Sequence, residues 1–204
     1  MATITILDKN SNYIEYYRQN ADFNFYCGSV LDYIPIGQIV YYVSPSNSLL
    51  FYDGGIDAAY QKMFGASNLV KISREYLSLY GKESKLGRKY LPIGSAFCYD
   101  FGDKKLISAP TMLLPQNVSE TENAYYATKA IQAILGKDIH KKEIEIIIPG
   151  LCCGYGGMSF EKSIDQQLMA FYYNQFASKE PTNVYINEPN LKDQPDCHMN
   201  TEFK

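Results

Sequence analysis

The chain has 204 residues, of which 46% are hydrophobic and 20% are charged, a balance typical of a globular domain that buries a core. A net charge of −3 does not provide the basic surface that nucleic-acid binding requires, so we expect no nucleic-acid partner. No apolar run approaches the roughly 18 residues of a membrane span, and the N-terminus lacks a signal-peptide pattern. We therefore expect no membrane partner and a cytoplasmic location. The abundance of Asn, Ile, Lys and Tyr suggests a viral or microbial source, in which case the location could be the host cytoplasm or nucleus.

The cysteines and histidines argue against disulfides and metal sites. An odd number of cysteines without framework spacing favours free thiols in a reducing compartment. A pair of histidines without a Cys-x-x-Cys motif argues against structural zinc, and we expect no metal and no cofactor. The residues concerned are Cys27, Cys98, Cys152, Cys153, Cys197, His140 and His198.

The first predicted elements are two strands separated by a short helix. Thr3–Leu7 alternates β-branched residues and predicts a strand. Ser11 is placed to cap a helix over Asn12–Arg18. Phe23–Val30 predicts a second strand, which ends in Cys-Gly-Ser-Val.

The next stretch contains the first candidate site. Ile39–Val43 is short, β-branched and aromatic and predicts a buried strand. The chain then passes Asn47 and Asp53 and crosses Gly54-Gly55 into a helix that the next glycine ends. A glycine pair at such a crossing lets the backbone approach a ligand, and N–H groups at a helix start can bind an anion. Asp57, in the first turn of this helix, and Asn47 are the polar residues best placed to act on that ligand.

The middle of the chain predicts a helix, a connection and a hairpin. Ser67 opens a helix that ends at Gly81, and Lys82–Lys89 is expected to be a basic, flexible connection. Phe97–Asp100 and Lys105–Ala109 then predict a β-hairpin. The apolar positions at helical spacing in the helix are Leu69, Ile72, Tyr76 and Leu79.

A further helix is predicted after position 119. Ser119 and Glu122 have the spacing of a capping box, and Gly136 ends the helix. Its expected apolar face consists of Ala124, Ala127, Ile131 and Ile134.

The last third of the chain repeats the order of strand, glycine loop and helix. Glu143–Pro149 is continuously apolar after its first residue apart from Glu145, as in a strand buried on both faces. A glycine-rich loop follows, and Ser159 caps a helix. A final strand is predicted over Asn183–Asn187. We expect one domain over residues 1–187 and a polar tail over 188–204.

Strands that alternate with helices predict an α/β fold, a three-layer α/β/α sandwich with a mixed, mostly parallel sheet. Both glycine loops follow the carboxyl ends of strands, where open α/β sheets place their ligands. We therefore expect the two loops to converge on one crevice that suits a dinucleotide-like ligand.

The stretch from Ser44 to Asp57 resembles the signature of the macro domains, which bind ADP-ribose. In their de-ADP-ribosylating branch a strand ends in Asn-Ala-Ala-Asn, and a glycine run and Val-Asp then open a helix, a form that fits this chain without gaps. The fourth position of the quartet, the last two glycines and the Val-Asp pair fall on Asn47, Gly54, Gly55, Ile56 and Asp57. The edges depart from the pattern: Ser44 replaces the first Asn, and Tyr52 and Asp53 replace earlier glycines.

Two further segments support the resemblance, which extends from about Phe23 to Asn187. Macro domains end their second strand in Gly-Asp-Ile, whose Asp accepts a hydrogen bond from adenine. Here Gly28 fits and Ser29 replaces the acid, so adenine recognition must differ or use Asp32. The loop Gly154-Tyr155-Gly156-Gly157 is similar to the family's diphosphate-binding loop.

The resemblance implies binding of ADP-ribose or an ADP-ribosylated substrate, and hydrolysis of the ADP-ribosyl linkage. The implied substrates are mono-ADP-ribosylated acidic side chains, O-acetyl-ADP-ribose or ADP-ribose 1″-phosphate. The implied catalytic residues are Asn47, which orients the distal ribose, and Asp57, which activates water or polarises a ribose hydroxyl. The expected ligand-binding residues are Gly28, Ser29, Val30, Asp53, Gly54, Gly55, Ile56, Cys153, Gly154, Tyr155, Gly156, Gly157 and Asn187. The sequence leaves the oligomeric state open.

Simpler interpretations exist for each of these residues. Asp57 could be an acid that the helix dipole stabilises, Asn47 a turn residue that bonds its own backbone, and the glycine loop a tight connection. Cys152 and Cys153 are interpreted as inert small residues. For the whole chain, the alternatives are a non-catalytic reader of ADP-ribose or a related nucleotide, and a scaffold that has lost the pocket.

Overall fold

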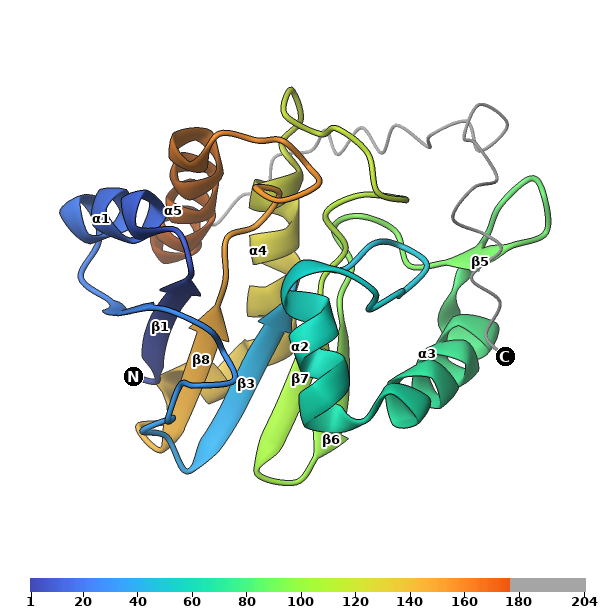
Figure 1. Cartoon of the computed structure of the whole chain (residues 1–204), viewed down its shortest axis with the longest axis horizontal. Helices are drawn as coiled ribbons and strands as arrows, with labels where there is room; N and C mark the ends of the chain where they lie inside the picture. The colour runs from blue at the N-terminus through green and yellow to red at the C-terminus, as the bar shows by residue number, and fades with distance from the viewer. Residues whose placement is uncertain (177–204) are drawn as a thin grey trace.

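The computed structural model describes residues 1–176 and has a six-stranded sheet at its centre, in the order β2-β1-β8-β3-β7-β6. All neighbouring pairs are parallel except β6 with β7. The carboxyl ends of the five parallel strands therefore lie at one edge, which is uppermost in Figure 1. The strands are β1 (Thr3–Asp8), β2 (Asn24–Cys27), β3 (Ile39–Ser44), β6 (Phe97–Phe101), β7 (Lys104–Ser108) and β8 (Ile144–Ile148).

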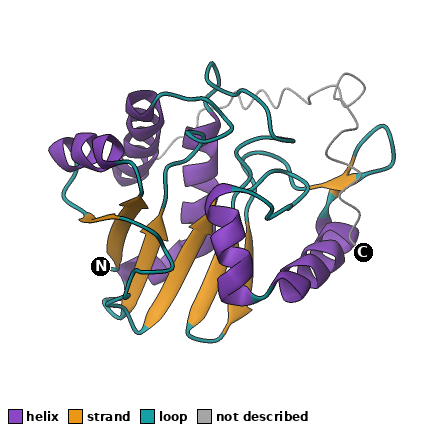
Figure 2. Cartoon of the chain, in the orientation of Figure 1, coloured by secondary structure: helices purple, strands orange, loops and turns teal. Residues whose placement is uncertain are grey.

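Helices cover both faces of this sheet, so the predicted three-layer α/β/α sandwich with a mixed, mostly parallel sheet is confirmed (Figure 2). One face carries α1 (Ser11–Asn20), α4 (Asn123–Leu135) and α5 (Phe160–Phe176), and the other carries α2 (Gly55–Phe64) and α3 (Ala66–Tyr80). Strand β8 shows why both faces are covered. Ile146 and Ile148 pack with the first group of helices and Ile147 with the second, because successive side chains of a strand point to opposite faces.

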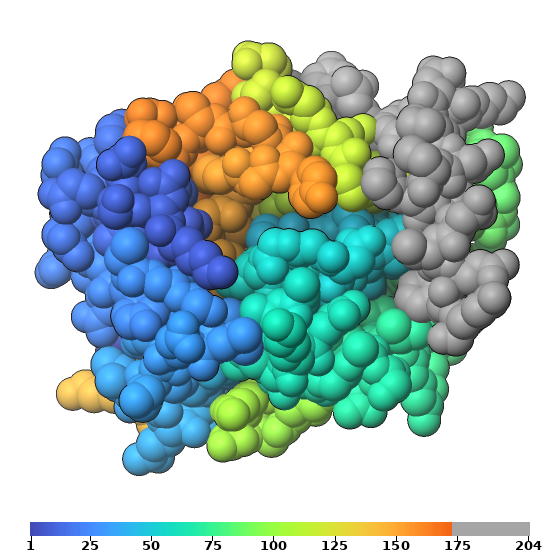
Figure 3. Space-filling view, viewed as in Figure 1, coloured from blue at the N-terminus to red at the C-terminus, as the bar shows by residue number. Residues whose placement is uncertain are grey.

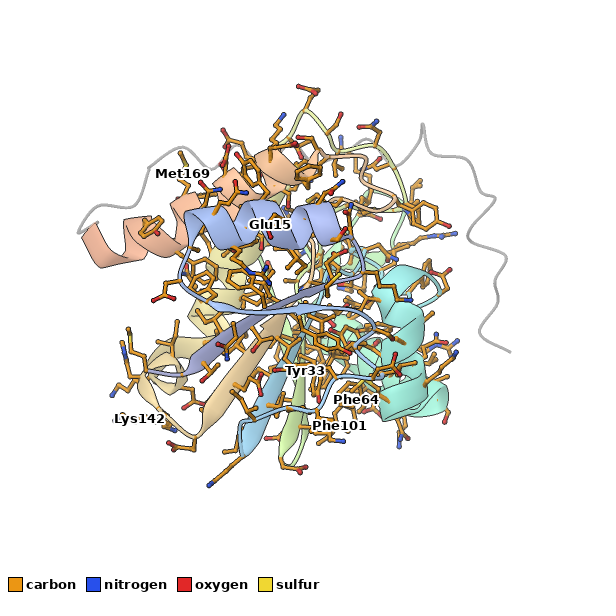
Figure 4. The ribbon with its side chains drawn as sticks, turned by 60° about the vertical axis from the view of Figure 1, so that its left-hand side comes forward. Glu15, Tyr33, Phe64, Phe101, Lys142 and Met169 are labelled. Atoms are coloured by element: carbon orange, nitrogen blue, oxygen red, sulfur yellow. The ribbon has the colours of Figure 1, made fainter. Side chains whose placement is uncertain are left out.

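Aromatic side chains anchor α2 to the sheet. The rings of Phe64, in the last turn of α2, and Phe101, at the end of β6, are stacked with centroids 4.9 Å apart, and they lie side by side in Figure 4. Tyr60 is fully buried, and its hydroxyl donates to the Val43 carbonyl at 2.9 Å. These contacts fix the helix that begins at the glycine pair.

Several element boundaries differ from the predictions near the N-terminus. The N-cap of α1 is Asn10 and not Ser11, because the Asn10 Oδ1 accepts from the N–H groups of Asn12 and Tyr13 at 3.0 and 3.4 Å. Strand β2 ends at Cys27 and does not reach Val30. The segment that follows turns instead, with the Ser29 carbonyl accepting from the Asp32 N–H at 3.0 Å.

The middle of the chain corrects two more predictions. The predicted flexible connection contains a two-stranded antiparallel sheet, β4 (Lys82–Glu83) with β5 (Lys89–Tyr90). Helix α3 ends before Gly81 as expected, but Leu79 is 74% exposed and takes no part in its apolar face.

The predicted capping box at α4 is wrong. Glu122 occupies the N-cap position without a side-chain capping bond, and the Ser119 N–H donates to the Asn117 side chain instead. Leu135 rather than Ile134 completes the buried face. The helix ends at Gly136, whose φ of 48° suits glycine, and a short 3-10 turn, η1 (Gly136–His140), follows.

The predicted final strand Asn183–Asn187 and the tail 188–204, with Cys197 and His198, lie outside the described residues. Within residues 1–176 the four cysteines are free thiols. No helix in this part of the chain is long and apolar enough to span a membrane.

Candidate functional site

A cavity of about 430 Å³ opens at the carboxyl edge of the sheet, within the range of about 300–1,000 Å³ typical of small-molecule sites. Figure 3 shows this face hollowed between the segment around residue 150, in orange, and the segment around residue 55, in cyan. Most of the predicted site residues line it: Gly28, Ser29, Val30, Asn47, Asp53, Gly54, Gly55, Ile56, Asp57, Cys153, Gly154 and Tyr155.

The two glycine corners meet across this cavity. A Cβ atom on Gly54 would lie only 3.3 Å from the Tyr155 ring, and both residues line the same cavity, so the two loops lie close together although they are far apart in the sequence. Gly55 has a φ of 56°, a left-handed conformation that glycine adopts without strain. The convergence expected from the sequence is therefore present.

The corners also present backbone donors. Among the described residues, no hydrogen-bond acceptor is found for the N–H groups of Gly55 and Ile56 at the start of α2, or for those of Gly154 and Tyr155. Unpaired N–H groups at a helix start carry partial positive charge and attract anions. Two sets of such groups on opposite loops form a cradle suited to a diphosphate.

Gly156 and Gly157 were expected to bind ligand but do not line the cavity. A Cβ atom on Gly156 would lie 2.3 Å from the Cys152 carbonyl oxygen and 2.8 Å from the Val118 side chain. The Gly156 carbonyl accepts from the Val118 N–H at 2.8 Å, and the Gly157 N–H bonds back to Gly154. These two glycines close the loop onto the body of the protein, and Ser159 then caps α5 as predicted, accepting from the Lys162 N–H at 3.3 Å.

Asp57 is the most perturbed acid of the site. Its side chain is 8% exposed, and its Oδ1 accepts from the Ser44 hydroxyl at 2.6 Å. Burial raises the pKa of Asp57 to about 7, the Ser44 hydrogen bond lowers it, and the charge of Asp53 raises it further. The carboxyl and carboxylate forms therefore coexist near neutral pH, which is the range suited to general acid–base chemistry.

Asn47 lines the cavity, but its amide is engaged by its own loop. The Asn47 Oδ1 accepts from the N–H groups of Leu49 and Phe51 at 3.0 and 3.3 Å, and its Nδ2 donates to the Phe51 carbonyl at 3.3 Å. These bonds hold the loop that leads to Asp53. An amide nitrogen has two donor hydrogens, so one remains for a ligand.

The wall at the end of β2 lacks the acid that the family signature places there. Ser29 lines the cavity, and its hydroxyl accepts from the Leu31 N–H at 3.2 Å in a local turn. Asp32 is exposed and does not line the cavity.

The residues at the end of β1 and just after it were not among the predicted site residues. Asp8, Lys9 and Asn10 line the cavity because β1 pairs in parallel with β8 and ends at the same edge. The Asp8 carboxylate accepts from the N–H groups of Asn10 and Gly150 at 2.8 and 3.1 Å, which ties the start of α1 to the loop after β8. The predicted strand over Thr3–Leu7 was the available signal, since carboxyl ends of parallel strands share an edge.

Cys152 and Cys153 behave as packing residues. Burial raises the pKa of the Cys152 thiol to about 12 and that of Cys153 to about 11, so both thiols are protonated near neutral pH and weakly nucleophilic. Within the described part of the chain no group of His, Cys, Asp and Glu side chains is arranged to hold a metal ion.

Solved structures of similar shape include macrodomains. The macrodomain of Mycobacterium tuberculosis DarG matches with a TM-score of 0.52 and 16% identity, over 72% of this chain and 88% of that one. The macrodomain of Thermus aquaticus DarG has a TM-score of 0.52 and 14% identity, over 84% and 92%. The Oceanobacillus iheyensis macrodomain with MES bound has a TM-score of 0.50 and 16% identity, over 66% and 68%. No family model matches the sequence, and no curated protein matches it.

Proposed function

We propose that this chain, which has the macrodomain fold, binds ADP-ribose in the cavity and hydrolyses ADP-ribosyl linkages. The observation that carries the proposal is the close approach of Gly54 and Tyr155 at a single cavity that Asp57 also lines. Two glycine corners and a carboxyl group of perturbed pKa, brought to one place from distant parts of the sequence, are what a diphosphate-linked sugar substrate requires.

Backbone N–H groups are proposed to provide most of the binding of the diphosphate. The N–H groups of Gly55 and Ile56 on one side, and of Gly154 and Tyr155 on the other, receive the diphosphate oxygens. The Asn47 amide uses its remaining N–H to orient the distal ribose. Gly28, Ser29 and Val30 form the wall toward the adenine. The acids of the lining, Asp8, Asp53 and Asp57, outnumber its cation, Lys9, so backbone donors rather than side-chain charge must supply most of the attraction for the anion.

The chemistry is assigned to Asp57. As a carboxylate it accepts a proton from a bound water, whose oxygen attacks the anomeric carbon of the distal ribose, or it polarises a ribose hydroxyl. The bond from that carbon to the leaving group breaks, and the leaving group departs with the electron pair. Holding the water in place makes the attack effectively intramolecular, and the base contributes about 10²–10⁴-fold.

The proposal is tested by replacing Asp57 with Ala. We expect turnover of an ADP-ribosylated protein to fall by at least about 10²-fold, in line with the loss of a general base. Affinity for ADP-ribose, measured by calorimetry, should stay within about tenfold, which is 1.4 kcal/mol of binding free energy. Unchanged turnover in Asp57→Ala would remove the catalytic part of the proposal, and no ADP-ribose binding by the unaltered protein would remove all of it.

A second candidate function is a non-catalytic reader of ADP-ribose or a related nucleotide. The engagement of the Asn47 amide by Leu49 and Phe51 favours it, because a side chain that braces its own loop has less freedom to act on a ribose. A reader would bind ADP-ribose in calorimetry and leave ADP-ribosylated protein intact in the same buffer.

A further inference from the structure

Ser44 stands at the end of β3, directly behind the proposed catalytic acid. We infer that the Ser44 hydroxyl is a positioning group for Asp57, which fixes one carboxyl oxygen so that the other is available to water or ligand in the cavity. The inference rests on the proposed function for its catalytic meaning. The hydrogen bond between Ser44 and Asp57 can itself be tested without an activity assay.

The geometry leaves Asp57 with one partner. The Ser44 Oγ lies 2.6 Å from the Asp57 Oδ1, and the side chains are 0% and 8% exposed. No other described residue donates a hydrogen bond to this carboxyl group, so Oδ2 is the oxygen left for a bound molecule. A single short bond between two buried groups restricts the rotation of the Asp57 side chain about its Cβ–Cγ bond.

Ser44 is itself held on a rigid element. It is the last residue of β3 and pairs with Ser108 of β7. Its carbonyl accepts from the Ala109 N–H at 3.0 Å. A site group is positioned more accurately when its support is a strand than when it is a loop. The sheet therefore holds Ser44 in place, and Ser44 holds the Asp57 carboxyl group on the first turn of α2.

A hydroxyl also suits an acid that titrates near neutral pH. A serine hydroxyl can donate to the carboxylate and accept from the protonated acid through the same oxygen atom, whereas an amide must present its nitrogen to the first and its oxygen to the second. The signature that this stretch resembles has an asparagine at this position. Serine in its place keeps a partner for Asp57 in both protonation states, so the contact persists through the pH range in which Asp57 changes charge.

Among the described residues, the other ionisable groups near Asp57 do not hydrogen-bond to its carboxyl group. Asp53, on the preceding loop, is exposed and disfavours the carboxylate form. The phenols of Tyr52, Tyr60 and Tyr99 are buried, and the pKa of each is raised by burial, so they remain neutral. Across the cavity stand Asp8 and Lys9.

The test compares Ser44→Ala with Ser46→Ala. Ser46 is equally buried, and its hydroxyl has no hydrogen-bond partner among the described residues, so its loss controls for removing a buried hydroxyl. A Ser44→Cys variant fills the space of the serine with a weak donor and serves if Ser44→Ala does not fold. The first readout is the pH titration of the Asp57 carboxyl carbon, followed by carbon-13 NMR in each variant. The second is the pH profile of hydrolysis, with the ADP-ribose dissociation constant measured alongside.

We expect Ser44→Ala and Ser44→Cys to move the Asp57 titration to higher pH, because the bond that favours the carboxylate is lost. Hydrolysis at pH 7 should fall by about tenfold or more, the rising limb of the profile should shift the same way, and ADP-ribose affinity should stay within about threefold, since Ser44 does not line the cavity. Ser46→Ala should match the unaltered protein.

An Asp57 titration that Ser44→Ala leaves in place would overturn the inference, as would a loss of ADP-ribose binding in that variant. If the unaltered protein binds no ADP-ribose while the titration still shifts, the proposed function fails and the Ser44–Asp57 link stands.

Discussion

At the scale of single residues, burial gives the Asp57 carboxyl group a pKa suited to acid–base chemistry and also makes the fold less stable at neutral pH. Its pKa is about 7 in the folded chain against an ordinary value of 3.8, chiefly because of burial. A group whose folded pKa is raised contributes its full stability below the unfolded pKa, and that stability is lost as pH rises toward the folded pKa. The fold therefore carries a penalty for Asp57 that grows from about pH 4 to pH 7 and stays constant above.

We expect Asp57→Asn to be more stable than the unaltered protein at pH 8 and nearly equal to it at pH 4. Asparagine is neutral at both values, and the shift of about three units in Asp57 corresponds to roughly 4 kcal/mol at 1.36 kcal/mol per unit. Urea unfolding at the two pH values measures the difference, with Asp32→Asn, an exposed acid, as the control. Equal midpoints for Asp57→Asn and the unaltered protein at pH 8 would contradict the buried, raised-pKa state.

The residues of the site that could be predicted from sequence are those that a local pattern identifies. Gly54, Gly55 and Asp57 stand at a strand-to-helix crossing, and they line the cavity as the spacing predicts. The partner of Asp57 could not be predicted, because Ser44 differs from the residue that the family signature has there and only coordinates reveal its 2.6 Å contact. Asp8 was missed because its place depends on β1 pairing with β8, whose paired residues are 142 positions apart (Thr3 with Glu145).

At the scale of elements, the loop after β8 divides its glycines between two tasks. Gly154 is exposed at the cavity, and a Cβ atom there would meet nothing within 4 Å. Gly156 is buried against the Cys152 carbonyl and Val118. The loop therefore has one glycine that leaves its backbone open to a ligand and another that allows close packing of backbone on backbone.

Alanine at these two positions should affect different properties, stability at Gly156 and ligand binding at Gly154. We expect Gly156→Ala to lower the free energy of unfolding by about 1–3 kcal/mol, because the added methyl overpacks a backbone contact. Gly154→Ala should stay within about 0.5 kcal/mol, as surface changes usually do, but should weaken ADP-ribose binding by crowding the diphosphate cradle. Urea unfolding and calorimetry on both variants separate the effects. A stable Gly156→Ala would show that the loop closes in another way.

The elements themselves were predicted best where burial enforces a pattern. The mainly apolar run of β8 and the glycine-marked C-terminal ends of α2 and α4 match the expectations closely. The two-residue strands β4 and β5 were missed because so short a pairing leaves no periodic signal. The capping box failed at Ser119 because a neighbouring asparagine side chain takes the Ser119 N–H, a competition that spacing does not reveal.

At the scale of the whole molecule, a buried acid toward the amino-terminal edge of the sheet joins three segments. Glu145, in β8, is 0% exposed and accepts from the hydroxyls of Thr5 in β1 and Tyr33 at 2.7 and 2.6 Å. Its other oxygen accepts from the N–H groups of Ile36 and Gly37 at 2.6 and 3.0 Å. The segment so held continues from Gly28, Ser29 and Val30, which form the cavity wall. Burial alone would raise the pKa of Glu145, but these four donors outweigh it and the pKa is lowered.

Replacing Glu145 with Gln should therefore destabilise the fold in a manner that depends on pH. Glutamine keeps the size, and its amide nitrogen can donate to the Thr5 and Tyr33 hydroxyls, but all four bonds lose the assistance of the negative charge. We expect a loss of about 2–4 kcal/mol at pH 7. A group with a lowered folded pKa stabilises the fold above its unfolded pKa, and this contribution disappears as pH falls through the folded pKa. The difference in free energy of unfolding between the variant and the unaltered protein, measured with urea, should consequently shrink below about pH 4. Glu143 is an exposed acid just before the same strand, and the control variant Glu143→Gln should unfold like the unaltered protein at every pH. If the loss of unfolding free energy in Glu145→Gln does not change with pH, packing and not the charge of Glu145 holds this segment.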